Sequence, residues 1–396
     1  MLQDGKKLVS QEVALNDLRA DKVLTSELFG PKSVVGELTS RSGLLRWLRV
    51  LFLPSGYPDS VSDSYLRYVK YTFLQVTLNN TNRVLATQAM LLAVGVGNAL
   101  PVAAALNWVL KDGIGHLGSI VVSASINRDF DSDPKRYRFQ AVTLGQVANL
   151  LSILSLSFPL GFLLLNSIGS SLSRVGVVQH ISSRARIYED FSKIGNLGDT
   201  MRASQAQTTA AALLGTVLGV ALAPAVLPDV AYALGIFFPV AAVTQYFAYR
   251  STDSVILRTF NTQRAEILIA DFFASSKAMT PEAVAKVEIF IGPPARVFDV
   301  NLFVNAEINE ALLIGVEKFN DSCFFMTRAG ENSVQLWIKE GATSAQVLQG
   351  FYEACRLRSQ AERVPEFNIF LQEIKEAGWN TEIVFLDDHY TRVTVA

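Results

Sequence analysis

The chain has 396 residues, enough for two or three domains and a large core. It contains 35 Lys and Arg against 36 Asp and Glu, and this net charge of -1 argues against bulk nucleic-acid binding. Only 18% of the residues are charged, compared with roughly 25% in an ordinary soluble domain, and the mean hydropathy is +0.27. The two cysteines and three histidines form no CxxC motif or Cys/His cluster, so we expect no disulfide scaffold and no metal site.

Residues 1–40 are a polar lead-in with charges of both signs and without the apolar core of a secretory signal. The stretch RSGLLRWLRVLF, residues 41–52, then spaces three arginines among leucines and aromatic residues. As a helix it would be basic and amphipathic, which suits either a membrane interface or packing on the protein's own core. The next helix is expected from about Tyr65, with Ser62 or Asp63 as its N-cap.

Long uncharged runs dominate the middle of the chain. They cover residues 84–110, 139–173, 203–228 and 230–249. A bilayer core requires roughly 20 apolar residues of helix, and each run is long enough. We therefore predict a membrane-embedded helical domain, with a large soluble helical core as the alternative. Basic residues flank the runs on every side, so the positive-inside rule does not orient the chain from sequence.

The third run carries small residues at every fourth position, namely Ala211, Gly215, Gly219 and Ala223. Such a stripe lets two helix backbones approach closely in lipid, where no hydrophobic force draws helices together. The partner helix could lie in the same chain or in another copy. Asp229, after the prolines that end this run, is expected to cap the next helix.

After Arg250 charges return, and the pattern predicts a small soluble α+β domain. Helices are expected to begin at Pro281, at Thr343 or Ser344, and at Pro365. Strands are expected at 333–340 and in two final segments, 381–387 and 392–396, joined by a turn. The predicted fold is mainly α. Its parts are a lead-in with the basic segment (1–52), an apolar helical domain (53–250) and the α+β domain (251–396).

The stretch NWVLKDGIGHLGSI contains Gly113, Gly115 and Gly118 in the spacing G-x-G-x-x-G. A dinucleotide site requires a strand before the first glycine and a helix after it. The preceding residues are rich in alanine and leucine and favour a helix, so we reject a nucleotide site. We expect instead a glycine-rich bend where two helices pack closely.

Charged and polar residues beside the apolar runs are the ligand-binding candidates. Ionisable groups next to a membrane segment usually face a cavity or each other, although they can also simply lie in water at the interface. Basic residues near an apolar run can meet a phosphate group or serve as ordinary flanking charges, and acids just before a helix can cap it. The candidates are Asp112, His116, Lys135, Arg136, Arg138, Asp199, Arg202 and Gln205.

PSGYPDSVSDSYLRY, NWVLKDGIGHLGSI, DSDPKRYRF and LRTFNTQRAEIL together resemble the root UVB sensitive (RUS) family over about residues 53–264. The resemblance implies a membrane-associated protein, in plastids or another endomembrane, linked to ultraviolet-B responses and vitamin B6 homeostasis. Many family members carry acids in the helix after the K-R-x-R element. Here the corresponding stretch, QAVTLGQVANL, has Val142 and Gln146 instead.

The resemblance implies a non-enzymatic regulator or scaffold that contacts membrane lipid and pairs with another copy or a paralogous family member. The alternative is a membrane binder or transporter of a small, phosphorylated ligand. An enzyme is the least favoured hypothesis, because no catalytic constellation or cofactor motif is evident in the sequence. We expect no cofactor and no nucleic-acid partner.

Overall fold

The computed structural model describes residues 41–97, 101–125, 129–226, 229–293, 297–306, 322–330, 332–359, 364–387 and 391–394. The lead-in therefore lies outside the described residues. The chain divides into two compact units. The helical unit comprises Met1–Asn127 and Tyr137–Val255, and the C-terminal unit comprises Arg128–Arg136 and Ile256–Ala396. The segment Arg128–Arg136 thus belongs with the C-terminal unit, although it lies between two apolar runs in sequence.

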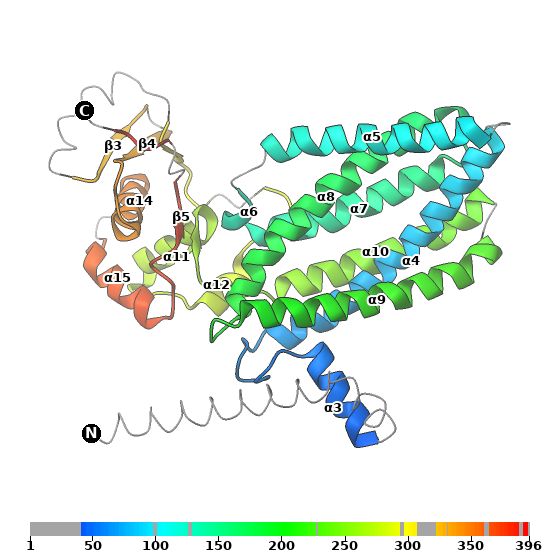
Figure 1. Ribbon diagram of the computed structural model, residues 1–396. Coiled ribbons are helices and arrows are strands. Elements are labelled where there is room, and N and C mark those ends of the chain that lie inside the picture. Colours follow the sequence, from blue (N-terminus) through cyan, green and yellow to red (C-terminus); the bar gives the residue numbers. More distant parts are fainter. Residues whose placement is uncertain are drawn as a thin grey trace. The chain divides into compact units, whose positions relative to one another are not determined.

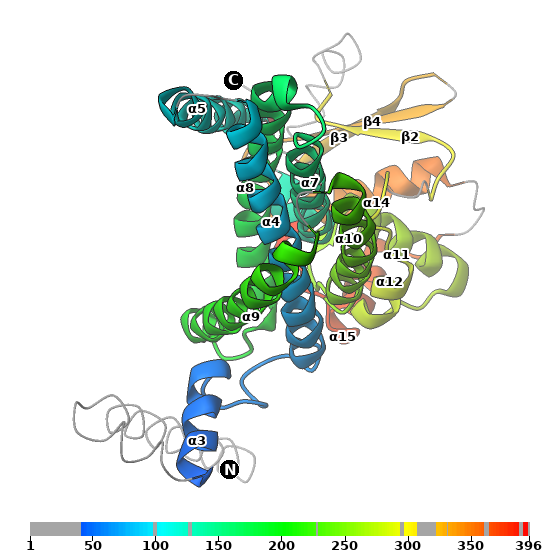
Figure 2. The ribbon, with the colours of Figure 1, turned by 90° about the vertical axis from the view of Figure 1, so that its right-hand side faces the viewer.

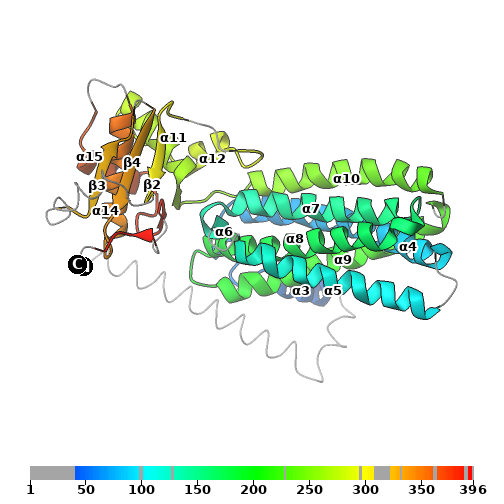
Figure 3. The same ribbon diagram turned by 90° about the horizontal axis from the view of Figure 1, so that it is seen from above.

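Within the described residues, the helical unit is built from one short α-helix, six long ones and a single 3-10 turn. Its elements are α3 (Arg41–Phe52), α4 (Tyr65–Gly97), α5 (Pro101–Ser125), α7 (Pro134–Leu154), η1 (Pro159–Gly161), α8 (Phe162–Phe191), α9 (Leu197–Val226) and α10 (Val230–Asp253). The long helices lie side by side and alternate in direction (Figures 1 and 3). Helix α4 packs along both α9 and α10, and α5 packs along α8. Figure 2 looks along this bundle and shows α4 between its neighbours.

Two helix starts that were predicted from nearby turn and capping residues are confirmed, those of α4 and α10. Helix α4 begins at Tyr65, and the Asp229 side chain caps α10 by accepting a 2.8 Å hydrogen bond from the Ala231 amide. The apolar runs, however, do not each form one helix. Residues 84–110 are shared between α4 and α5, and residues 139–173 between α7 and α8.

Among the described residues, three helical segments are long and apolar enough to cross a membrane, not the four predicted from the runs. They are Pro159–Phe191, Leu197–Pro224 and Val230–Asp253. At most 33% of the most apolar window in any of them is buried. At least two thirds of each of these windows is therefore not fully buried within the chain.

The expected glycine-rich bend is wrong, because Gly113, Gly115 and Gly118 lie inside the continuous helix α5. A Cβ at Gly118 would lie 2.7 Å from the Ser171 Oγ of α8, and Gly115 is similarly close to Ser170. These two glycines therefore let α5 and α8 pack closely without any break in the helix. Gly113 has no such neighbour within 4 Å. A glycine costs a helix only about 1 kcal/mol relative to alanine, which packing can offset.

The small-residue stripe of α9 packs against α4 of the same chain. A Cβ at Gly219 would lie 2.6 Å from the Val84 Cβ, and the Thr81 hydroxyl donates a 3.2 Å hydrogen bond to the Gly215 carbonyl. Ala211 is fully buried and Ala223 is partly buried. The helix that fills this stripe is thus α4.

The C-terminal unit contains a three-stranded sheet and a parallel strand pair. Its elements are α6 (Asp129–Ser132), β1 (Phe260–Asn261), α11 (Thr262–Ser275), α12 (Pro281–Val287), β2 (Asn301–Val304), β3 (Phe324–Arg328), β4 (Ser333–Ile338), α14 (Ser344–Arg358), α15 (Phe367–Glu376) and β5 (Val384–Phe385). The sheet order is β2-β4-β3, with β2 parallel and β3 antiparallel to β4, and its core includes Leu268, Val334 and Phe351.

The predicted strand at β4 and the helix starts at α12 and α14 are confirmed. Thr343 caps α14 in a reciprocal capping box with Gln346. The described parts of the two final segments do not pair with each other. Instead β5 pairs with β1, and Val393 forms an isolated bridge with Lys339. The residues with which these segments pair, β1 and Lys339, lie far away in sequence, so the sequence of the segments themselves does not predict the pairing.

Candidate functional site

A row of polar side chains runs along one face of α4 inside the helical unit. Tyr68, Thr72, Gln75, Asn79 and Asn82 recur at alternating intervals of four and three residues, which places them on one side of a helix. All are buried except Asn79, which is partly buried. We call these five residues the polar seam. Burying polar side chains is costly unless they are hydrogen-bonded, so the partners of the seam decide what it does.

Helix α7 supplies partners for the seam. Gln146 donates a 2.8 Å hydrogen bond to the Asn79 Oδ1 atom and accepts a 3.0 Å bond from the Asn82 side-chain amide. Arg138 lies two turns earlier on the same helix. Its Nε donates to the Tyr68 hydroxyl at 3.3 Å, and its Nη2 donates to the Gln75 Oε1 at 3.1 Å. The seam is therefore a network of polar contacts between α4 and α7.

Arg138 places a positive charge inside the helical unit. Its residue is only 2% exposed, and both of its described hydrogen-bond partners are neutral. Within the described part of the chain it forms no ion pair with a carboxylate. The next turn of α7 on this side carries Val142, which is also buried. A buried charge without a counter-charge costs several kcal/mol, on the order of the cost of breaking a buried ion pair.

Two seam atoms lack a hydrogen-bond partner. The Thr72 hydroxyl and the Asn82 Oδ1 are buried, and no partner for them is present among the described residues. More than nine in ten buried polar groups in native proteins are satisfied. Such atoms occur at many places in the described part of the chain, and those of Thr72 and Asn82 mark points on the seam that water or a ligand can complete.

The other sequence candidates divide among separate places. Asp112 of α5 accepts a 2.8 Å bond from Lys111 and lies 3.8 Å from Arg174 of α8, so it does not reach the seam. The Lys111 ammonium also lies 4.6 Å from the ring centre of Trp108. His116 is exposed on α5.

Asp199 and Arg202 fasten the end of α3 to α9. Arg202 donates to the Leu51 and Leu53 carbonyls at 3.3 and 3.2 Å, and it pairs with Asp199 at 2.9 Å. Because the last carbonyls of a helix have no partner within it, these bonds act as a cap. Gln205 instead accepts a 3.3 Å bond from Arg184 at the surface. These three residues are structural contacts and not parts of the seam.

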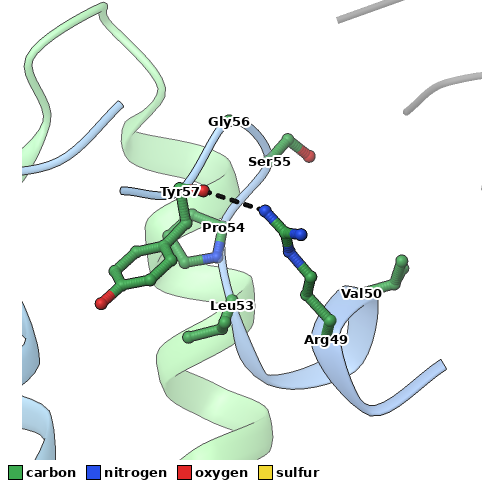
Figure 4. Close-up of a pocket in the computed structure, with 7 residues that line it drawn as sticks. All are labelled: Arg49, Val50, Leu53, Pro54, Ser55, Gly56 and Tyr57. Carbon is green, nitrogen blue, oxygen red and sulfur yellow. Dashed lines mark hydrogen bonds between the residues drawn. The ribbon is translucent and has the colours of Figure 1, made fainter. Parts of the chain in front are cut away.

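A small cavity lies where α3 meets the following loop (Figure 4). Arg49 crosses it and donates a 3.1 Å hydrogen bond to the Tyr57 carbonyl. Its volume is about 40 Å³, which is room for a few water molecules and not for a vitamin-sized ligand. The lining residues are Arg49, Val50, Leu53, Pro54, Ser55, Gly56 and Tyr57.

Lys135 belongs to a buried ion cluster in the C-terminal unit. Glu288 lies 2.7 Å from Lys135 and 2.6 Å from Arg264, and all three side chains are essentially inaccessible. Burial alone would raise the pKa of Glu288, but Arg264 and Lys135 outweigh it and lower the pKa to about 2. Arg264 also donates to the Ser132 carbonyl at 3.1 Å. The cluster therefore holds the segment Arg128–Arg136 within this unit.

Arg136 pairs with Asp133 at 2.6 Å and donates to the Ile289 carbonyl at 3.2 Å, so it too serves this attachment. The structure thus divides the basic candidates at 135–138 between two places. Arg138 faces the seam, whereas Lys135 and Arg136 hold the C-terminal unit together. Sequence reasoning missed Glu288 and Arg264, because no local pattern links residues so far apart.

Comparison with known proteins identifies the family. Residues 39–276, more than half of the chain, match the model of the vitamin B6 photo-protection and homoeostasis domain. The chain is 27% identical over 362 residues to root UVB sensitive 2, chloroplastic, of Arabidopsis thaliana, covering 86% of this chain and 83% of that protein. It is 31% identical over 247 residues to root UVB sensitive 3 of the same plant, covering 61% and 56%.

A third relative is RUS family member 1 of Dictyostelium discoideum, which is 30% identical over 260 residues, covering 63% of this chain and 49% of that protein. No solved structure is significantly similar. The matched domain contains the whole polar seam, Arg138 and the first part of the C-terminal unit. The chain belongs to the root UVB sensitive (RUS) family.

Proposed function

We propose that this chain is an integral membrane member of the RUS family that binds a small polar ligand inside its helical unit, and that it serves vitamin B6 homeostasis in this way. The observation that carries the proposal is the distribution of polarity in that unit. Polar side chains line the interior as the seam, while apolar side chains cover the outside. The name of the matched family domain supports the link to vitamin B6.

The outside of the helical unit is apolar over four helices. Large exposed side chains lie on α5, α8, α9 and α10, among them Leu117 (67%), Leu164 (67%), Val217 (65%) and Phe238 (55%). Scattered exposed apolar residues are normal in soluble proteins, but contiguous apolar faces mark contact with a partner or a membrane. Lipid chains fit faces that run along helices long enough to span a bilayer.

One end of the helical unit carries features of a membrane–water interface. Arg250 of α10 lies over the rings of Tyr71 and Tyr246, at 5.2 and 5.9 Å from their centres, and donates to both hydroxyls. Aromatic and arginine side chains gather at the headgroup level of membrane proteins. At the opposite end, the described connection 155–161 carries no charged residue, and Asp229 caps the start of α10. Basic residues that are scattered in the sequence therefore lie at one end of the unit in the fold. By the positive-inside rule, we expect the Arg250 end to stay on the side of the membrane from which the chain inserts.

Pairing with another family member stays a prediction. The glycine stripe was its sequence feature, and α4 of the same chain now fills that stripe. A pairing surface would therefore have to use other residues. The polar interior favours ligand binding over a purely scaffolding role, because polar groups inside a membrane are expensive and usually mark a ligand or ion pathway.

The test is binding of vitamin B6 forms to the purified protein in detergent. Equilibrium dialysis with labelled pyridoxine and pyridoxine 5′-phosphate should show saturable binding of at least one form. Gln146→Leu removes the bridge between Asn79 and Asn82 and should abolish that binding. Gln205→Leu changes an amide at the surface and should leave it intact. Folded wild-type protein that binds neither form would refute the proposal.

A further inference from the structure

We propose that the polar seam is an anion site, in which Arg138 binds a phosphate group of the ligand. This rests on the proposed function and deepens it, because it names the chemical class of the ligand. The guanidinium is buried, it has neutral partners only, and an unpaired hydroxyl lies on the seam beside those partners. A bound phosphate would supply the missing negative charge.

The guanidinium retains capacity for an anion. Arginine has five N–H donors, and the described side-chain bonds of Arg138 use Nε and Nη2. A phosphate accepts two parallel bonds from one guanidinium, a geometry that a neutral amide such as Gln75 cannot offer. The two present bonds, at 3.3 and 3.1 Å, are longer than charge-assisted bonds of about 2.7–2.9 Å. Arg138 is thus held in place without being neutralised.

Thr72 is the second observation. It lies on α4 four residues after Tyr68 and three before Gln75, the two residues that hold Arg138. Its hydroxyl is buried and has no partner among the described residues. A hydroxyl in this position can donate to a phosphate oxygen, which would satisfy it. Charge and unpaired donor therefore converge on one stretch of the seam.

Access to the site requires movement. Arg138 is 2% exposed, so α4 and α7 have to separate locally before a ligand reaches it. Association that depends on a conformational change is slower than the usual 10⁵–10⁷ M⁻¹s⁻¹, so we expect an association rate below about 10⁵ M⁻¹s⁻¹. The apolar surroundings of the site shield a bound anion from water, and this strengthens its attraction to the Arg138 guanidinium.

The experiment compares three probes on purified protein in detergent. Pyridoxine 5′-phosphate is the anionic probe, and it has no aldehyde to react with lysines. Pyridoxine is its neutral counterpart, and inorganic phosphate reports the anion alone. Nanodiscs with anionic phosphatidylglycerol or zwitterionic phosphatidylcholine distinguish a lipid headgroup from a soluble phosphate. If only the anionic lipid competes with pyridoxine 5′-phosphate, the site binds headgroups. If neither lipid competes, the site binds the free ester.

Arg138→Gln should weaken binding of pyridoxine 5′-phosphate at least tenfold, while Arg67→Gln, an exposed arginine on α4, should change it less than twofold. Arg138→Lys retains the charge and should recover part of the affinity. If Arg138→Gln does not fold, Thr72→Val serves instead, because it removes an unpaired hydroxyl and should lower affinity without lowering stability. Equal binding of the phosphate ester by wild type, Arg138→Gln and Thr72→Val would overturn the anion site. Tight binding of neutral pyridoxine that Arg138→Gln does not weaken would also overturn the anion site, but it would agree with the proposed function.

Discussion

Replacing Gly215 with alanine tests whether the stripe on α9 is filled from within the chain. The new Cβ would lie 2.8 Å from the Asn80 Cβ and still closer to the Thr77 carbonyl oxygen. Real Cβ contacts are not that short, and the carbonyl belongs to the backbone of α4, so a helix must move. Overpacking typically costs about 1–3 kcal/mol, and the helix propensity of alanine returns up to about 1 kcal/mol. We expect a net loss of up to about 2 kcal/mol.

The matched control is Gly235→Ala on α10, where a Cβ would meet nothing within 4 Å. That change adds helix propensity without a clash, so it should raise stability by about 0.5–1 kcal/mol. Circular dichroism during thermal unfolding in mild detergent measures both variants, and light scattering measures their mass. The in-chain account would be refuted if Gly215→Ala were as stable as Gly235→Ala, or if it lost an oligomer while keeping its stability.

Two further predictions concern the contacts that hold each unit together. Glu288→Gln leaves Lys135 and Arg264 buried without a carboxylate and should cost about 3–5 kcal/mol in urea unfolding of the C-terminal unit, whereas Glu282→Gln at an exposed pair should cost little. Because the pKa of Glu288 in the folded protein is about 2, below its ordinary 4.5, its contribution to stability is complete above about pH 4.5 and is lost as the pH falls towards 2. A urea-unfolding midpoint that does not change across that pH range would contradict this. Arg202→Ala should free α3 and speed its proteolysis severalfold, and unchanged cleavage relative to Arg67→Ala would show that Arg202 does not hold the helix.

Local signals predicted element boundaries well, because they depend on neighbouring residues. The Asp229 cap and the Thr343 capping box are of this kind. The division of the apolar runs was missed, although Pro101 and Pro159 stand at the first positions of α5 and η1, where proline is favoured. Hydropathy alone does not show where an apolar helix turns back.

The site was only partly predictable. Arg138 was a candidate from sequence, but its partners Tyr68 and Gln75 lie 70 and 63 residues away. The alternating four-and-three spacing of polar residues on α4 was visible and would have indicated the seam. Its meaning depended on knowing that α7 faces it. Lys135 and Arg138 are three residues apart, yet only the fold shows that they serve different units.

The most direct test of the account asks whether the helical unit spans a membrane. Helix α8 has 30 residues, so about 45 Å separates its ends, with Leu160 just before it and Lys193 just after it. In a Cys323→Ser background, where Cys355 is fully buried, Leu160→Cys and Lys193→Cys are labelled with a membrane-impermeant maleimide in sealed vesicles. The account predicts that one position reacts in intact vesicles and the other reacts only after detergent is added. Equal reaction of both in intact vesicles would contradict it.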